Sequence, residues 1–300
     1  MPALQTTKKT SVSCAISEEI FILKKFEDYM RPSVLKKSDK IIIISPSGKV
    51  EEESIRLACK KLEAWGLNVQ FGSHAFDVYN KLAGKDEDRI SDLQLALDDE
   101  SIKAIFCSRG GYGLVRIIDS IDFSAFKINP KWIIGFSDVT VLHNHINLMN
   151  IATIHGPMPN SFKSTLETAM NSLKSALFDK NYQLANPFLG EEIVGGNLAI
   201  VYSLLGTNSD IDTKGKVLLL EDIGEYTYNI DRMIFALKKA GKFEGIKGLL
   251  VGQFSGIKKD GFGFSVQEII ENCIAEYDFP IHYDIPVGHV YDNRAVVLGS

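Results

Sequence analysis

Short, fully apolar runs alternate with amphipathic segments along the chain, and this alternation constrains the fold more than any other feature. Runs at 40–44, 104–107, 132–136 and 216–220 have the length of strands, and helical patterns follow them. Strands that are buried on both faces read as continuous apolar runs, which is typical of parallel sheets covered by helices. The sequence therefore predicts an α/β fold with its functional groups beyond the carboxyl ends of the strands.

The length of 300 residues and a change in composition after residue 160 indicate two folded units. We expect a parallel sheet in the first unit and a smaller α/β domain in the second. A short amphipathic helix is also expected at 18–29, and the segment 296–300 reads as one arm of a hairpin. The predicted units are an N-terminal extension at 1–36, an N-terminal α/β domain at 37–165, a linker with some helix at 166–190 and a C-terminal domain at 191–300.

Charge and composition exclude several classes of protein. The net charge is −5 and the Lys and Arg residues are dispersed, so no nucleic-acid partner is expected. The longest apolar runs have only the length of strands, and no secretory leader is recognisable, so no membrane span is expected. The four cysteines have spacings of neither a zinc site nor a disulfide framework, which indicates reduced thiols and a cytoplasmic location. They are Cys14, Cys59, Cys107 and Cys273.

Ser137 stands directly between an apolar run and a helical pattern. The run at 132–136 ends at the serine, and Val139 and Leu142 then follow on one helical face. A serine on such a turn projects from the sheet beside free backbone N–H groups, which is the geometry of a nucleophile elbow. Val139 replaces the last glycine of the usual G-x-S-x-G pattern, so a buried helix-capping serine fits equally well. We expect the Asp138 side chain to cap the elbow helix.

A serine nucleophile needs a base, most often a histidine that a carboxylate orients. His155 in a predicted loop and His289 at a predicted turn both fit this role, and spacing alone does not separate them. His143 and His145 lie about 200° apart on the predicted elbow helix and cannot chelate one metal together. We expect those two rings to be packing or surface groups, and no metal site is predicted.

Glu221 is the strongest candidate for the orienting carboxylate, because it ends the apolar run at 216–220. Parallel sheets present functional groups at such strand ends. Asp222 and Glu225 are close rivals, and Asp222 fits the capping of the following turn equally well.

The glycine-rich segment 109–113 follows another predicted strand. Its glycines permit unusual backbone dihedrals, and its N–H groups fit half of an oxyanion hole. Arg116 occupies the third glycine position of a dinucleotide loop, and no G-x-x-x-x-G-K-[ST] sequence occurs. No nucleotide cofactor, and no other cofactor, is therefore expected.

Several motifs along the chain together resemble the LD-carboxypeptidase family of serine peptidases, from about residue 35 to the end. The resemblance implies two domains, with the nucleophile in the parallel-sheet N-terminal domain and the base and its acid in the C-terminal domain. The motifs, in chain order, are Ser-Arg-Gly-Gly-Tyr-Gly (108–113), Gly-Phe-Ser-Asp-Val-Thr (135–140), His-Gly-Pro-Met (155–158), Gly-Gly-Asn-Leu (195–198), Leu-Glu-Asp-Ile-Gly-Glu (220–225) with Ile-Asp-Arg-Met (230–233), and Pro-Val-Gly-His (286–289).

The resemblance implies a role for each motif residue. Ser137 would be the nucleophile, His289 the general base and Glu221 the orienting acid, with the backbone N–H groups of Gly111 and Asp138 as oxyanion donors. Members of the family hydrolyse the L,D bond of murein tetrapeptides, release D-alanine, and typically act as cytoplasmic homodimers. One branch instead inactivates a peptide–nucleotide antibiotic.

Substrate recognition leaves several readings open. An exopeptidase binds a free carboxylate, for which the guanidinium of Arg109 or Arg232 is suited, although either could instead brace a loop. Asn197 either orients substrate or caps a helix. Two rival functions remain: the same triad acting on a peptide–nucleotide, or a binding protein for muropeptides without catalysis.

Overall fold

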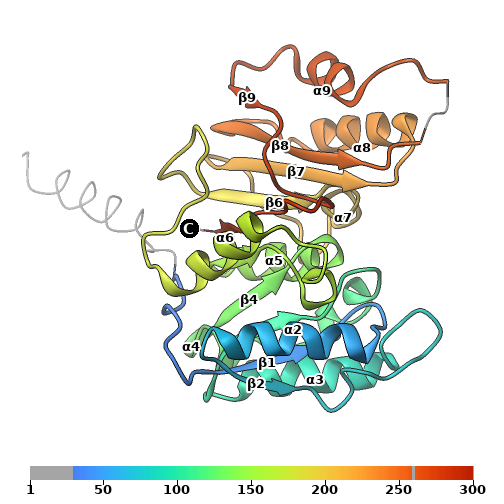
Figure 1. The fold of residues 1–300 in the computed structure, drawn as a ribbon. Helices are drawn as coiled ribbons and strands as arrows, with labels where there is room; N and C mark the ends of the chain where they lie inside the picture. Colours follow the sequence, from blue (N-terminus) through green and yellow to red (C-terminus); the bar gives the residue numbers. More distant parts are fainter. Residues whose placement is uncertain (1–29, 259–260, 300) are drawn as a thin grey trace, which may run out of the picture.

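The computed structural model describes residues 30–258 and 261–299, which form two α/β domains (Figure 1). The N-terminal sheet has the strand order β10-β5-β4-β3-β1-β2, in which β1 to β5 are parallel and β10 is antiparallel to β5. The C-terminal sheet is parallel, in the order β6-β7-β8-β9. The strands are β1 (Lys40–Ile44), β2 (Asn68–Phe71), β3 (Ile102–Cys107), β4 (Trp132–Gly135), β5 (Thr153–His155), β6 (Ile193–Asn197), β7 (Val217–Ile223), β8 (Gly248–Ser255), β9 (Ile281–His282) and β10 (Val296–Leu298).

Helices bury both faces of the N-terminal sheet, as its unbroken apolar strands predict. Ile133 and Ile134 are neighbours on β4, yet they belong to different hydrophobic clusters because successive strand residues point to opposite faces. Helices α2 and α6 pack into one cluster, and α3, α4 and α5 pack into the other. The α-helices are α2 (Glu52–Ala64), α3 (Asp86–Asp98), α4 (Ser124–Ile128), α5 (Thr140–Asn147), α6 (Glu167–Phe178), α7 (Leu198–Ser203), α8 (Thr227–Lys239) and α9 (Val266–Ile274).

Two segments expected outside the domains pack against the N-terminal core. Leu35, within the predicted extension, is 3% exposed and lies in a hydrophobic cluster of this domain. The predicted linker contains α6, whose Met170 and Leu173 are buried in the same cluster. Their apolar spacing, rather than the polar average of these segments, decides where they pack. The helix expected at 18–29 lies outside the described residues.

The last strand joins the two domains. Instead of one arm of a hairpin, β10 is an edge strand of the N-terminal sheet, where Val296 pairs with His155. Directly after it, the N–H of Gly299 donates to the carbonyl of Ile193 on the other sheet at 2.8 Å. The chain therefore returns from the C-terminal domain to the strand that neighbours β4.

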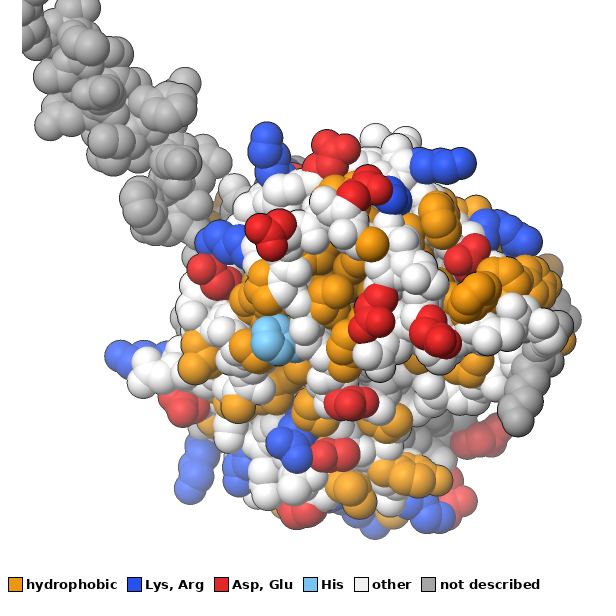
Figure 2. All heavy atoms as spheres, turned by 90° about the horizontal axis from the view of Figure 1, so that it is seen from above, with side chains coloured by type: hydrophobic (Ala, Val, Ile, Leu, Met, Phe, Trp, Pro, Cys, Tyr) orange, Lys and Arg blue, Asp and Glu red, His pale blue; other side chains and the backbone are white. Residues whose placement is uncertain are grey.

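The helix expected after the glycine-rich segment is replaced by two 3₁₀ turns, Leu114–Arg116 and Ile118–Ser120. None of the helices in the described parts of the chain is long and apolar enough to cross a bilayer. Figure 2 looks down on the C-terminal domain and shows patches of hydrophobic side chains with acidic side chains between them.

Candidate active site

Ser137 lies on a sharp turn between β4 and α5. Its φ of 63° is in the left-handed region, which is uncommon for a residue with a Cβ, and the 3₁₀ turn Ser137–Val139 leads directly into the helix. A Cβ on Gly135 would lie 2.7 Å from Val139 Cγ2, so the first glycine of the elbow makes room for the valine that replaces the last one. The strand-to-helix turn expected around Ser137 is thus present.

The glycine-rich segment lies against this turn. A Cβ on Gly110 would lie 2.9 Å from Ser137 Oγ and 3.3 Å from the Asp138 nitrogen, so only glycine permits this approach. The next residue, Gly111, has a φ of 111°. The Gly110 backbone therefore lies directly against Ser137 and the first amide of the elbow.

The Asp138 side chain does not cap the elbow helix, and that expectation was wrong. Its buried Oδ2 accepts a hydrogen bond from Ser47 Oγ at 2.6 Å and another from the Leu114 N–H at 3.0 Å. Burial raises the pKa of this carboxyl, and the two hydrogen bonds oppose that rise. The Asp138 side chain therefore holds the loops after β1 and β3 against the elbow.

Glu221 and His289 form a buried pair in the C-terminal domain. His289 Nδ1 donates to Glu221 Oε2 at 2.9 Å; the glutamate is fully buried, and the histidine side chain is 17% exposed. Burial alone would raise the pKa of Glu221, but the rings of His155 and His289 face the carboxylate and lower it to about 2. The glutamate is therefore an anion that can fix the tautomer and orientation of the His289 ring.

A glycine makes the pairing possible. Gly288 has a φ of 126°, and a Cβ there would lie 2.8 Å from Glu221 Oε2. Ser255 Oγ donates to the His289 carbonyl at 3.1 Å and holds the backbone from the other side. The backbone of the Pro-Val-Gly-His motif therefore passes close to Glu221 on β7.

His289 also reaches the N-terminal domain. Its ring centroid lies 4.8 Å from that of Phe136, the residue that precedes Ser137. Both rings line an open cavity of about 480 Å³ between the domains. The remaining lining residues are Ser161, Ser164, Thr165, Val290, Tyr291 and Asn293.

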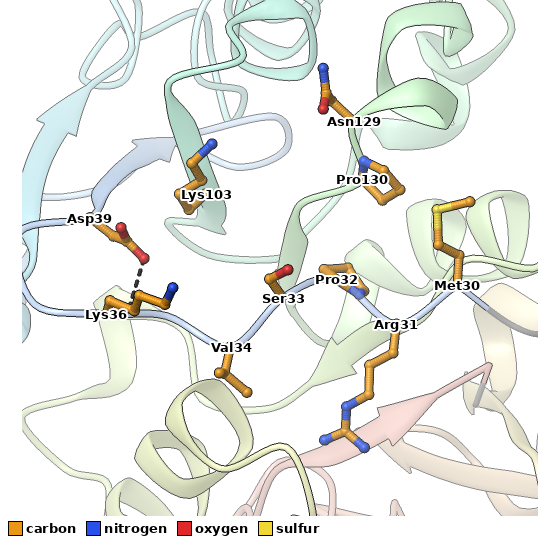
Figure 3. A pocket seen from close by; sticks show the side chains of 10 residues that line it. All are labelled: Met30, Arg31, Pro32, Ser33, Val34, Lys36, Asp39, Lys103, Asn129 and Pro130. Carbon is orange, nitrogen blue, oxygen red and sulfur yellow. Dashed lines mark hydrogen bonds between the residues drawn. The ribbon is translucent and has the colours of Figure 1, made fainter.

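A second cavity, of about 440 Å³, lies at the amino ends of the strands of the N-terminal sheet (Figure 3). Lys103 at the start of β3 and Asn129 and Pro130 before β4 line it, together with the segment around Lys36. These positions mark the amino ends of the strands, so this cavity is remote from the elbow.

Asn197 caps α7 and also contacts Glu221 of the buried pair. Its Oδ1 accepts the Ile200 N–H at 3.2 Å and caps α7, while its Nδ2 lies 3.3 Å from Glu221 Oε1 and 3.0 Å from Asp222 Oδ1. Asp222 also accepts from the Ala199 N–H at 3.0 Å, and burial raises its pKa to about 6. Glu225, the other rival for the acid, instead accepts a hydrogen bond from Asn229.

The remaining candidate histidines have different surroundings in the fold. His155 is not in a loop: it is the last residue of β5, fully buried, with its Nε2 3.9 Å from Glu221 Oε1. His143 Nε2 donates to the Gly135 carbonyl at 2.9 Å, and burial lowers its pKa to about 3. His145 Nδ1 lies 2.9 Å from Ser209 Oγ. Both helix histidines are packing groups, as expected.

The two arginines are held by local contacts. Arg109 Nη1 donates to the Lys49 carbonyl at 3.0 Å, and Arg232 Nη1 donates to Asn229 Oδ1 at 2.9 Å. The Arg232 guanidinium lies over the Tyr228 ring. The Arg109 contact joins the loops after β3 and β1, whereas both contacts of Arg232 lie within α8.

Among the described residues, one cluster of a histidine and two aspartates has the side-chain types that ligate metal ions. His74, Asp77 and Asp88 have ligand atoms within 4.8 Å of one another. His74 Nδ1 hydrogen-bonds Asp77 Oδ2 at 2.8 Å, so these atoms already satisfy one another. Within the described residues, Cys59, Cys107 and Cys273 are buried free thiols.

Comparison with known proteins places the chain in a family. The model of the LD-carboxypeptidase N-terminal domain matches residues 41–156, and that of the C-terminal domain matches residues 191–300. The chain belongs to the LD-carboxypeptidase family. The resemblance of the six motif blocks is therefore confirmed, as is the two-domain α/β fold class.

The similarity to individual relatives extends over most of the chain. It is 32% identical to a probable murein peptide carboxypeptidase of Bacillus subtilis, over 90% of each chain. It is 27% identical to a murein tetrapeptide carboxypeptidase of Pseudomonas aeruginosa, over 87% of this chain and 91% of that protein. The crystal structure of an MccF-like protein from Bacillus anthracis superposes with a TM-score of 0.76 at 26% identity, covering 90% of this chain and 94% of that one.

Proposed function

We propose that the protein is a serine-type LD-carboxypeptidase that hydrolyses the L,D peptide bond of murein tetrapeptides and releases D-alanine. The hydrogen bond from His289 to the buried Glu221, beside a serine elbow, is the observation that carries this proposal. The murein peptide carboxypeptidases among the relatives supply the substrate class.

In the proposed reaction Ser137 Oγ attacks the carbonyl carbon of the L,D bond while His289 takes the hydroxyl proton. The negative charge on the carbonyl oxygen is received by the backbone N–H groups of Gly111 and Asp138, and each such donor lowers the barrier by roughly 2.7–4 kcal/mol. His289 then passes its proton to the leaving amine of D-alanine. Water, deprotonated by the same ring, cleaves the resulting ester, and Glu221 holds the ring in one tautomer throughout.

An exopeptidase must also hold the carboxylate of the terminal residue. We assign this contact to Arg109 in preference to Arg232, because Arg109 directly precedes the Gly110 turn that lies against Ser137. Asn197 then acts on Glu221 rather than on substrate.

The test is incubation with a disaccharide tetrapeptide, followed by mass spectrometry of the products. The wild-type protein should release one D-alanine per molecule, and Ser137→Ala should release none while it keeps its unfolding free energy within about 1 kcal/mol. Undiminished release by Ser137→Ala would refute the assignment of the nucleophile. Labelling by a fluorophosphonate, absent from Ser137→Ala, separates an enzyme from a protein that only binds muropeptides.

A second candidate activity is hydrolysis of a peptide–nucleotide. The rings of Tyr226 and Tyr228 stack with centroids 5.6 Å apart beyond the carboxyl end of β7, and Lys258 lies 5.0 Å from the first ring. Such a platform suits a nucleobase and its phosphate. The similarity to the MccF-like protein favours the same reading. Turnover of an aspartyl-adenylate analogue at a higher kcat/KM than the tetrapeptide would establish this activity instead.

We further propose that the protein is a cytoplasmic homodimer. Family membership and buried free thiols support this proposal. Sedimentation equilibrium at micromolar concentration should give a mass of twice 33.3 kDa, and a single-chain mass would contradict it.

A further inference from the structure

His155 is a buried imidazole without a hydrogen-bond partner for either ring nitrogen among the described residues. Its backbone is fixed on both sides, because β5 pairs with Gly135 of β4 and with Val296 of β10. Buried polar side chains in native proteins are nearly always hydrogen-bonded, and each exception calls for an explanation. The ring lies directly beside the strand that ends at the elbow.

The Glu221 carboxylate lies close to this ring. His155 Nε2 lies 3.9 Å from Glu221 Oε1, while the other carboxylate oxygen receives the hydrogen bond from His289. Asn197 Nδ2 faces the same Oε1, at 3.3 Å. A shift of about 1 Å, within ordinary side-chain motion, would bring His155 to hydrogen-bond distance.

We propose that His155 is a positioning residue of the catalytic machinery: its Nε2–H closes onto Glu221 Oε1 and holds the carboxylate in the orientation that serves His289. The inference rests on the proposed function and adds to it a contribution of the N-terminal domain to the acid of the triad. Glu221 is then held between two imidazoles, one from each domain, so the closed arrangement of the domains and the oriented carboxylate form together.

The surroundings of the carboxylate restrict the competing explanations. The titratable groups that face Glu221 are His155 from β5, His289 from the segment after β9 and Asp222, its neighbour on β7. Asp222 is engaged with Asn197 and with backbone N–H groups. Among these groups, His155 alone has a donor available for Oε1 and no other partner in the described residues.

The first test uses the rate at which a fluorophosphonate labels Ser137 as a function of pH, alongside kcat and KM for D-alanine release. His155→Leu should lower the labelling rate and kcat about tenfold to hundredfold with little change in KM, since a hydrogen bond to a charged group is lost. In His155→Leu, the fall of the labelling rate at low pH should begin at a higher pH than in the wild-type protein. The reason is that a Glu221 carboxylate without the His155 hydrogen bond attracts the His289 proton more strongly. His155→Gln, whose amide can donate to Glu221, should recover most of the rate.

His143→Leu is the matched control, since it removes a buried imidazole whose ring does not face Glu221. It should leave the low-pH fall of the labelling rate at the wild-type pH. The inference would be overturned if His155→Leu and His155→Gln lost equal factors in kcat, or if the low-pH fall of the labelling rate in His155→Leu stayed at the wild-type pH. In either case, labelling of the wild-type protein would leave the proposed function intact. A wild-type protein that neither reacts with the probe nor releases D-alanine would refute both.

A second measurement needs no variant. The ¹⁵N chemical shifts of the imidazole nitrogens in the wild-type protein report which nitrogen carries the proton. We expect the His155 ring to carry its proton on Nε2 and to exchange it slowly. A ring protonated on Nδ1 alone has no donor toward Glu221 and contradicts the proposal.

Discussion

The backbone N–H of Asn197 donates to Thr140 Oγ1 at 3.1 Å, and this bond joins the end of β6 to the first turn of α5. Thr140 follows Ser137 by one turn, and Asn197 contacts Glu221. One hydroxyl thus ties the nucleophile's helix to the domain that holds the acid and the base.

Gly196 makes this approach possible, and Gly196→Ala should disrupt it. A Cβ there would lie 2.7 Å from Thr140 Oγ1, and the φ of 133° is strained for any residue but glycine. We expect the variant to lose about 3 kcal/mol of unfolding free energy, from backbone strain and overpacking together. Urea unfolding measures this loss, and fluorophosphonate labelling of Ser137 should slow in parallel.

Gly206→Ala is the control, because Gly206 also has a positive φ, of 75°, but a Cβ there meets no atom within 4 Å. We expect a loss of only about 1 kcal/mol and an unchanged labelling rate. If both variants lost the same stability, strain alone would explain the effect, and the contact with Thr140 would carry no weight.

Glu221→Gln should remove both activity and a pH-dependent part of stability. The folded-state pKa of Glu221 is about 2, below the usual value of 4.5. Its contribution is therefore complete above about pH 4.5 and is lost as pH falls through about 2. We expect the wild-type protein to exceed the variant by roughly 3 kcal/mol at pH 7, with the difference shrinking below pH 4. kcat should fall by about 10³–10⁴, as for loss of an orienting carboxylate.

Unfolding curves between pH 3 and pH 7 test the stability part of this prediction. Glu225→Gln is the matched control, because Glu225 lies on the same segment and bonds Asn229 rather than a histidine. It should show neither the loss in kcat nor the pH-dependent difference. A constant gap between wild type and Glu221→Gln over the whole range would show that the carboxylate is not stabilised by the two rings.

The sequence was most informative where chemistry and local geometry coincide. The apolar run into Ser137 predicted a strand and a sharp turn, and the end of the run at Leu220 predicted a buried strand, which continues through Glu221 to Ile223. His155 was misplaced in a loop because β5 has only three residues, too few for a strand pattern to be visible. Choosing between His155 and His289 as base required the family motifs.

Contacts between distant segments could not be predicted from local patterns. The pairing of β10 with β5 depends on how the C-terminal domain docks, and the apolar run Val296–Leu298 fits one arm of a hairpin equally well. Asp138 fits a helix cap by its position, but its carboxylate instead accepts hydrogen bonds from Ser47 and from the Leu114 N–H. Tertiary contacts decided both cases.

Ser137→Gly should be more stable than Ser137→Ala, contrary to the usual order of these residues. Glycine normally costs about 0.5–1 kcal/mol relative to alanine through the entropy of the unfolded chain. At Ser137, however, the φ of 63° places a Cβ in the left-handed region, which costs roughly 1–2 kcal/mol for residues other than glycine. We therefore expect Ser137→Gly to exceed Ser137→Ala by up to about 1 kcal/mol in urea unfolding. The reverse order would mean that the elbow is not strained, and that the hydroxyl is presented without stored backbone energy.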